Sequence, residues 1–211
     1  YLAVRSYAHW VRWSARWMVG LRSEIRGIIP EGEVLIAAKH QSFFDAILIV
    51  SAVPKPKFIM KNSLKYAPVL GWFGLRIGCI CVVRGKRTQA IKSMVAAVNS
   101  GNSPAGQLII YPQGTRIAPG ASAPYKIGTA VLYQETGQTC IPAATNVGVF
   151  WPKHGILRQP GLAVIEFLPA IQPGLSNELF MHRLEEVIEQ SSNALLEEAA
   201  TDGFYPVGQD T

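Results

Sequence analysis

The sequence predicts one α/β domain with a largely parallel central sheet flanked by helices. Three observations lead to this fold class. Short apolar runs rich in β-branched residues recur along the chain, and most are bounded by glycine or proline, as buried strands are. Helical segments separate these runs. Neither a linker nor an internal repeat divides the chain, so the alternation indicates one sheet whose strands are joined by crossover helices.

Residues 1–26 are predicted to form a basic amphipathic helix. At about 100° per residue, the arginines fall on one side and three tryptophans, Trp10, Trp13 and Trp17, gather on the other. A basic helix with a tryptophan-rich face is typical of a helix lying in the headgroup region of a membrane. The alternative is a helix whose aromatic face packs on the domain core while its arginines face water.

The elements of the domain follow from the apolar runs and the periodic segments between them. The predicted strands are residues 34–38, 57–60, 79–83, 107–111, 139–144 and 162–167. The predicted helices are residues 43–52, 64–75, 88–100, 126–135 and 177–200, the last of them acidic and amphipathic. We therefore expect an interfacial helix at residues 1–26, a domain at residues 27–200 and a tail at residues 201–211.

Charge is distributed unevenly along the chain. The formal net charge is +6, but residues 171–211 hold eight acidic residues and one basic residue, so the rest of the chain is strongly basic. A basic body predicts an anionic partner, either anionic lipid or nucleic acid. No known nucleic-acid motif is present, and no continuously apolar, uncharged stretch reaches the roughly 18 residues of a spanning helix. We expect an anionic membrane surface as the partner, and no nucleic acid.

The segment from Lys39 to Ala46 carries the most reactive candidates. His40 ends a predicted strand, and Ser42 with Asp45 has the spacing of a capping box, which places Asp45 in the first helical turn. From the loop before this cap, the His40 ring can fold back over the turn. Asp45 would then bind one imidazole nitrogen and leave the other as a general base. The alternative is that Asp45 only caps the helix.

A second candidate is the turn at residues 111–116, which follows a predicted strand at the end where α/β folds bind ligands. Turn amides around Gly114, the Thr115 hydroxyl and the Arg116 guanidinium could converge on a phosphate. The apolar strand at residues 79–83 delivers Arg84 at its carboxyl end. Each of these segments could also be an ordinary turn or strand end with a surface arginine.

The order of these segments resembles the glycerolipid acyltransferase family, and its bacterial lysophosphatidic acid acyltransferases in particular. The matching pattern is His-x4-Asp, then Gly-x-Ile-x3-Arg, then Pro-x-Gly-Thr-Arg, then a strand with an early proline at residues 141–146. Further similarity lies at the lysine-bearing turn around Lys61, at the segment 68–72 and at residues 125–130. The resemblance covers about residues 27–170.

Two departures from the family pattern stand out. The family's third motif usually reads Phe-Pro-Glu-Gly-Thr-Arg, whereas this chain has Tyr111 and Gln113 in place of the phenylalanine and the glutamate. Tyrosine keeps the aromatic packing, while Gln113 removes a carboxylate associated with binding the acceptor. In the second motif, Val83 precedes Arg84 where relatives often have an acidic residue. Gln113 therefore bears on the choice of acceptor and leaves the His40–Asp45 pair unchanged.

The resemblance implies transfer of a fatty acyl group from acyl carrier protein or coenzyme A to the free sn-2 hydroxyl of lysophosphatidic acid, giving phosphatidic acid. His40 would be the base, oriented by Asp45. Arg116, Thr115 and Arg84 would hold the acceptor phosphate, with Gly114 and Gln113 in the same turn and Lys61 as a further candidate. No cofactor beyond the thioester co-substrate is expected. The four histidines lack ligand spacing, so no metal is expected either.

The resemblance also implies phospholipid biosynthesis at the cytoplasmic face of the inner cell membrane. Two alternatives stay open at this point. One is an acyltransferase for another lysolipid, such as lyso-ornithine lipid, and the other is a non-catalytic module that binds anionic lipid. A hydrolase using the same pair would need a nucleophile, and no Gly-x-Ser-x-Gly elbow is present.

Overall fold

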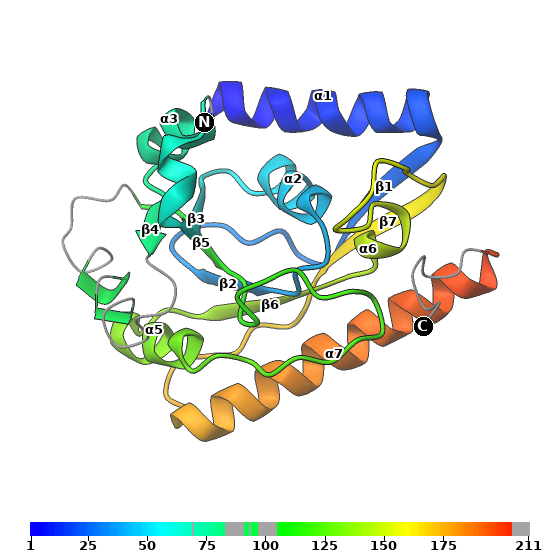
Figure 1. Cartoon of the computed structure of the whole chain (residues 1–211). Helices are drawn as coiled ribbons and strands as arrows, with labels where there is room; N and C mark the ends of the chain where they lie inside the picture. Colours follow the sequence, from blue (N-terminus) through cyan, green and yellow to red (C-terminus); the bar gives the residue numbers. More distant parts are fainter. Residues whose placement is uncertain (69, 83–90, 93, 97–104, 204–211) are drawn as a thin grey trace.

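The computed structural model describes residues 1–68, 70–82, 91–92, 94–96 and 105–203, and within them it forms a mostly parallel sheet with helices on both faces (Figure 1). The seven strands lie in the order β1-β7-β6-β2-β5-β3-β4. Every neighbouring pair is parallel except β6 and β7, which are antiparallel. The predicted fold class is confirmed.

The first helix, α1 (Leu2–Val19), is shorter than the sequence predicts. Gly20 adopts a left-handed conformation with φ of 72° and ends the helix. The following residues form β1 (Leu21–Arg26), which pairs in parallel with β7 (Gly161–Phe167) at the edge of the sheet. The predicted helix is therefore wrong for residues 21–26. The periodic arginines continue past Gly20, but the backbone hydrogen bonds of residues 21–26 are made with β7, which lies far along the chain.

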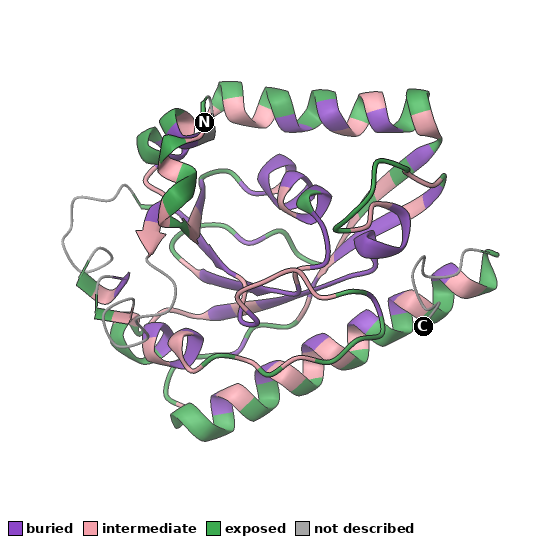
Figure 2. Cartoon of the chain, viewed as in Figure 1, coloured by how far each residue is buried: buried purple, intermediate pink, exposed green. Residues whose placement is uncertain are grey.

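The tryptophans of α1 do not pack on the core. Small residues, Ala8 and Ala15 among them, face the domain, whereas Trp10, Trp13 and Trp17 are 59%, 60% and 71% exposed. Exposed residues line α1 on the side away from the sheet (Figure 2). The alternative in which the aromatic face packs on the domain is therefore excluded. Among the described residues, no helix is both long and apolar enough to cross a bilayer.

The predicted strands agree with the structure to within one or two residues at each end. They correspond to β2 (Leu35–Ala38), β3 (Pro56–Lys61), β4 (Ile80–Val82), β5 (Gln107–Ile110), β6 (Cys140–Thr145) and β7. All four residues of β2 and of β5 are buried, because helices cover both faces of the central strands. Apolar burial on both faces explains why these strands appear as continuous apolar runs.

The helices differ more from the prediction. The helix α2 (Phe43–Ala52) has the predicted bounds, α5 (Gly128–Thr136) begins two residues late, and α7 (Asn177–Thr201) ends one residue beyond the predicted end. The segment predicted as one helix at residues 64–75 is a 3₁₀ helix, η1 (Asn62–Tyr66), followed by α3 (Leu70–Arg76). Pro68 lies between them, and a proline disfavours helix at the residue before it. A short helix, α6 (Val147–Phe150), was not predicted.

Some predictions lie partly or wholly outside the described residues. Residues 91–92 and 94–96 are helical, but the rest of the predicted helix at residues 88–100 is not described. Arg84 and the tail from residue 204 also lie outside the described residues.

Two groups of buried apolar residues lie on the two faces of the sheet. One joins α1 and α2 to the sheet through residues such as Val11, Leu48 and Ile109. The other joins α5 and α7 to the opposite face through residues such as Leu132 and Leu184. Figure 2 shows the buried residues concentrated on the central strands and on the inner sides of these helices. This packing fixes the strand ends that carry the candidate site.

Candidate active site

The sheet topology brings the predicted site segments to one edge. Strands β6, β2, β5, β3 and β4 are mutually parallel, so their carboxyl ends share that edge. His40 follows β2, and Tyr111 follows the adjacent strand β5. Lys61 ends β3, one strand further along, and its side chain is exposed. Strand ends of this kind are where α/β proteins place their ligands.

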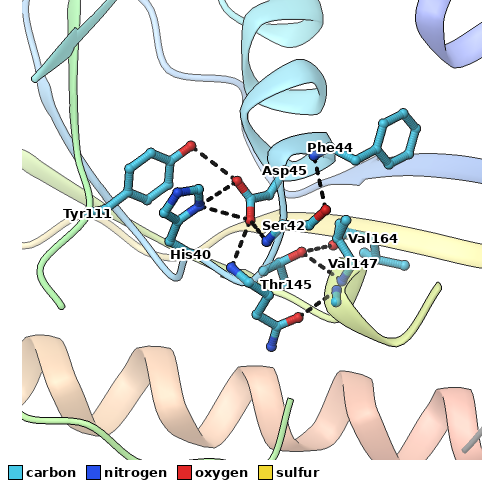
Figure 3. Close-up of polar contacts among 10 residues, drawn as sticks. His40, Ser42, Phe44, Asp45, Tyr111, Thr145, Val147 and Val164 are labelled. Carbon is cyan, nitrogen blue, oxygen red and sulfur yellow. Dashed lines mark hydrogen bonds and ion pairs between the residues drawn. The ribbon is translucent and has the colours of Figure 1, made fainter. Parts of the chain in front are cut away.

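The loop at residues 39–42 ends in a capping box that begins α2 (Figure 3). The Ser42 hydroxyl accepts from the Phe44 amide at 3.1 Å, and the Asp45 carboxylate accepts from the Ser42 amide at 2.7 Å. These bonds satisfy backbone donors that a helix start leaves free. The sequence-predicted cap is thus present, and it turns the carboxylate of Asp45 back over the loop.

Asp45 and His40 form the predicted pair. The imidazole Nδ1 of His40 lies 2.9 Å from Oδ1 and 3.2 Å from Oδ2 of Asp45 (Figure 3). Asp45 is fully buried, whereas the side chain of His40 is 19% exposed. With Nδ1 donating to the carboxylate, the second nitrogen, Nε2, is left with its lone pair to accept a proton. Asp45 therefore does more than cap the helix, because its buried carboxylate also orients the ring of His40.

Tyr111 is a part of this site that the sequence did not predict. Its hydroxyl donates to Oδ1 of Asp45 at 3.2 Å, and its ring stacks on the imidazole of His40 with ring centroids 3.8 Å apart and planes 15° apart. Burial of the hydroxyl, together with the charge of Asp45, raises its pKa well above the ordinary value, so it stays protonated as a donor. From the sequence, tyrosine for phenylalanine was expected only to conserve packing.

Tertiary contacts on both sides hold the loop that carries His40. Lys39 is buried, and its Nζ lies 2.5 and 2.6 Å from the carboxylate oxygens of Glu189 on α7. The Tyr125 hydroxyl donates to the same carboxylate at 2.8 Å. The side chain of Gln41 accepts from the amide of Gly148 at 2.9 Å. Two helices distant in sequence, α7 and α6, thereby fix the residues on either side of His40.

The turn at residues 112–116 lies against the same loop. The amide of Ile117 donates to the carbonyl of His40 at 2.8 Å, which joins the end of this turn to the loop that carries His40. Gly114 has a φ of 69°, and a Cβ there would lie 2.6 Å from the Nζ of Lys126. The left-handed conformation is what favours glycine here, because the end of the lysine side chain is flexible and could move aside. Thr115 and Arg116 are partly exposed beside it.

Gln113 is buried beneath this turn. Its amide nitrogen donates to the carbonyl of Ala123 at 3.2 Å, while its amide oxygen is buried without a hydrogen-bond partner among the residues that the structure describes. A buried acceptor that is left unpaired costs free energy, of the order of 1–3 kcal/mol. Gln113 therefore retains an unused acceptor next to the turn, in the position where the resembled family usually has a carboxylate.

The structure thus brings together His40, Asp45 and the turn that carries Thr115 and Arg116. It leaves Lys61 on the same edge but at a more distant strand, and Arg84 lies outside the described residues. Within the described part of the chain, no cluster of three or more histidine, cysteine or acidic side chains could hold a metal ion. The arrangement places an imidazole oriented by a buried carboxylate and a turn that carries an arginine at one edge of the sheet.

Comparisons with known proteins agree with this arrangement. The model of the family described as Acyltransferase matches residues 21–146, more than half of the chain. The 1-acyl-sn-glycerol-3-phosphate acyltransferase of Pseudomonas aeruginosa is 28% identical over 80% of this chain and 66% of its own length. The protein of the same name from Saccharomyces cerevisiae is 25% identical over 92% of this chain and 65% of its own length. The chain thus spans slightly less than two thirds of the length of these relatives.

The fold is also similar to that of a solved acyltransferase structure. The crystal structure of the 1-acyl-sn-glycerophosphate (LPA) acyltransferase PlsC from Thermotoga maritima superposes with a TM-score of 0.74 and covers 92% of this chain and 78% of its own. The two chains are 19% identical, so the likeness concerns the fold.

Proposed function

This chain belongs to the acyltransferase family, and we propose that it transfers a fatty acyl group from a thioester to the sn-2 hydroxyl of lysophosphatidic acid. The observation that carries the proposal is the contact of 2.9 Å between Nδ1 of His40 and the buried Asp45 carboxylate. It leaves Nε2 of His40 as a base at the edge of the sheet. The names of the similar proteins support the choice of acceptor.

The chemistry requires no covalent enzyme intermediate. An alcohol is a poor nucleophile at neutral pH, so Nε2 of His40 takes the hydroxyl proton as the oxygen attacks the thioester carbonyl. Asp45 stabilises the imidazolium that forms. The carbon–sulfur bond then breaks, the new ester remains on the acceptor, and the departing thiolate receives the proton from His40. Acyl-coenzyme A and acyl carrier protein both supply the required thioester, and no cofactor takes part.

The turn at residues 112–116 is proposed to hold the acceptor phosphate. Arg116 can bind phosphate oxygens through two parallel N–H donors, and the Thr115 hydroxyl and the amides around Gly114 add donors in the same turn. Lys61 and Arg84 are proposed to contribute further positive charge. Gln113 offers a neutral acceptor there, because its amide oxygen has no hydrogen-bond partner. Holding the phosphate would place the hydroxyl near His40.

The exposed aromatic face of α1 is proposed to lie on an anionic membrane, at the cytoplasmic face of the inner cell membrane. Trp10, Trp13 and Trp17 are all more than half exposed. Tryptophan is favoured at the headgroup level, where one edge of the ring stays wet, and the basic body would add electrostatic attraction to anionic lipid. Acceptor and product both reside in such a membrane.

The proposal is tested by measuring turnover of a panel of lysolipids with one acyl donor, and then exchanging the donor. The purified chain should acylate lysophosphatidic acid and give phosphatidic acid with oleoyl-coenzyme A or oleoyl-acyl carrier protein. Faster turnover of lyso-ornithine lipid than of lysophosphatidic acid would show that the proposed acceptor is wrong and that the proposed reaction, acyl transfer, is right. Binding of anionic vesicles without turnover of any lysolipid would favour a non-catalytic lipid-binding module.

A further inference from the structure

Tyr111 contacts both members of the catalytic pair. Its ring lies face to face with the imidazole of His40, with centroids 3.8 Å apart, while its hydroxyl donates to Asp45 at 3.2 Å. Figure 3 shows the tyrosine reaching across the imidazole to the carboxylate. Phe58 also stacks with Tyr111, with ring centroids 6.2 Å apart, so the tyrosine ring is itself supported. One side chain that follows β5 therefore contacts both His40, in the loop before α2, and Asp45, in the first turn of α2.

The two oxygens of Asp45 share His40, whose Nδ1 lies 2.9 Å from Oδ1 and 3.2 Å from Oδ2, but their other partners differ. Oδ2 accepts from the backbone amides of Gln41 and Ser42 at 2.8 and 2.7 Å, which belong to the helix cap. Oδ1 accepts from Nδ1 of His40 at 2.9 Å and from the hydroxyl of Tyr111 at 3.2 Å. The cap fixes one oxygen through the local backbone. Tyr111, which follows β5, donates to Oδ1, the oxygen closer to Nδ1 of His40.

The ring and the hydroxyl have separable effects. The imidazole of His40 has one edge held by Asp45, and stacking on Tyr111 restricts rotation of its plane. The Tyr111 hydroxyl limits rotation of the Asp45 carboxylate about the Cβ–Cγ bond, so that Oδ1 stays directed at Nδ1 of His40. A base must be aligned with the proton it removes, and small misplacements lower the rate strongly.

We propose that Tyr111 is a positioning residue of the His40–Asp45 pair, in which the ring sets the plane of the imidazole and the hydroxyl sets the orientation of the carboxylate. The inference rests on the proposed function of His40 as a general base. It assigns a role to the residue at which this chain has tyrosine where the resembled family usually has phenylalanine. In this chain the substitution adds a hydrogen bond to the catalytic carboxylate.

The test compares Tyr111→Phe, which removes the hydroxyl and keeps the ring, with Tyr111→Leu, which removes both. Tyr133→Phe is the matched control, because Tyr133 is a buried tyrosine on α5 whose hydroxyl donates to the carbonyl of Gln172, away from the pair. We expect kcat to fall roughly 3- to 10-fold in Tyr111→Phe and roughly 100-fold in Tyr111→Leu, with the acceptor KM nearly unchanged. Tyr133→Phe should keep both constants.

A measurement without substrate separates this inference from the proposed reaction. In proton NMR spectra, the ring protons of His40 lie over the Tyr111 ring and should be shifted by its ring current; the His40 signals are assigned by their loss in His40→Gln. The shift should persist in Tyr111→Phe and disappear in Tyr111→Leu. If the chain turns over no lysolipid, the proposed reaction fails, but this spectroscopic comparison still decides whether the ring positions His40.

Three results would overturn the inference. Equal kcat values in the wild type, Tyr111→Phe and Tyr111→Leu would exclude positioning. A rise in acceptor KM at unchanged kcat would assign Tyr111 to substrate binding instead. A loss of activity in Tyr133→Phe as large as that in Tyr111→Phe, with equal losses in thermal stability, would reduce the effect to general destabilisation.

Discussion

The His40–Asp45 pair and the turn at residues 112–116 lie at neighbouring strand ends, and the protein fixes their side chains to very different degrees. The carboxylate of Asp45 is buried and accepts hydrogen bonds from two backbone amides, an imidazole and a tyrosine hydroxyl. Within the part of the chain that the structure describes, the side chains of Thr115 and Arg116 make no hydrogen bond or ion pair. The backbone of the turn, in contrast, is well held.

This difference indicates a division of roles. A general base must be aligned before the substrate arrives, because its contribution depends on geometry in the transition state. A group that binds a phosphate can remain hydrated until the phosphate replaces the water. We therefore expect changes at the pair to lower kcat and changes at the turn to raise the acceptor KM. The predictions below test that separation, beginning with the largest effect.

Replacing His40 with alanine should reduce kcat by about 10³-fold, because proton removal by a positioned base contributes roughly 10²- to 10⁴-fold. The fold should persist, since the ring is partly exposed and the cap bonds of Ser42 remain. Steady-state kinetics and a thermal melt of the purified variant measure both effects. His154→Ala, at an exposed loop histidine, is the control. A variant that keeps the wild-type rate would remove His40 from the mechanism.

Replacing Arg116 with alanine should raise the acceptor KM about 10- to 100-fold at nearly constant kcat, as expected for one or two charge-assisted hydrogen bonds to a phosphate. Arg116→Lys should fall between, because lysine keeps the charge without the planar fork. Kinetics with lysophosphatidic acid measure the change, and Arg183→Ala on the exposed face of α7 controls for net charge. If kcat falls while KM stays constant, the division between base and turn is wrong.

Replacing Trp10, Trp13 and Trp17 together with serine should weaken binding to anionic vesicles roughly tenfold, because the exposed apolar area of α1 sets that affinity. Activity on a detergent-dispersed acceptor should stay the same. Deleting residues 1–26 would be a poor test, because β1 pairs with β7 in the sheet. Co-sedimentation with vesicles measures binding, and Leu179→Ser at an exposed leucine of α7 is the control. Unchanged sedimentation would refute the interfacial role of α1.

Local sequence signals predicted those parts of the fold that depend on neighbouring residues. The bounds of α2 follow from the Ser42 cap and the apolar residues after it, and the central strands follow from continuous apolar runs. The pairing of His40 with Asp45 was also predictable, because the cap itself turns the carboxylate back over the preceding loop. In the cap and in the pair, the atoms that interact lie within five residues of one another, and in the strands the signal is the apolar run itself.

The segments that were predicted wrongly or missed depend on distant partners or on local breaks. Strand β1 has a mixed, partly exposed side-chain pattern, and only its pairing with β7 makes it a strand. Pro68 signals the break between η1 and α3 in the sequence, but the apolar periodicity around it led to the prediction of one continuous helix. The four-residue helix α6 is too short to produce a periodic signal.

By itself, the sequence determined the fold class, the order of the motifs and the pairing of His40 with Asp45, because periodicity, caps and residue chemistry are local properties. Tertiary structure decided the hydrogen bond from the Tyr111 hydroxyl to Asp45, which lie 66 residues apart in the sequence. It also decided the ion pair between Lys39 and Glu189, which lie 150 residues apart. It also decided that the tryptophans of α1 face outward. Contacts of this kind depend on which strands become neighbours in the sheet, and no local pattern specifies that order.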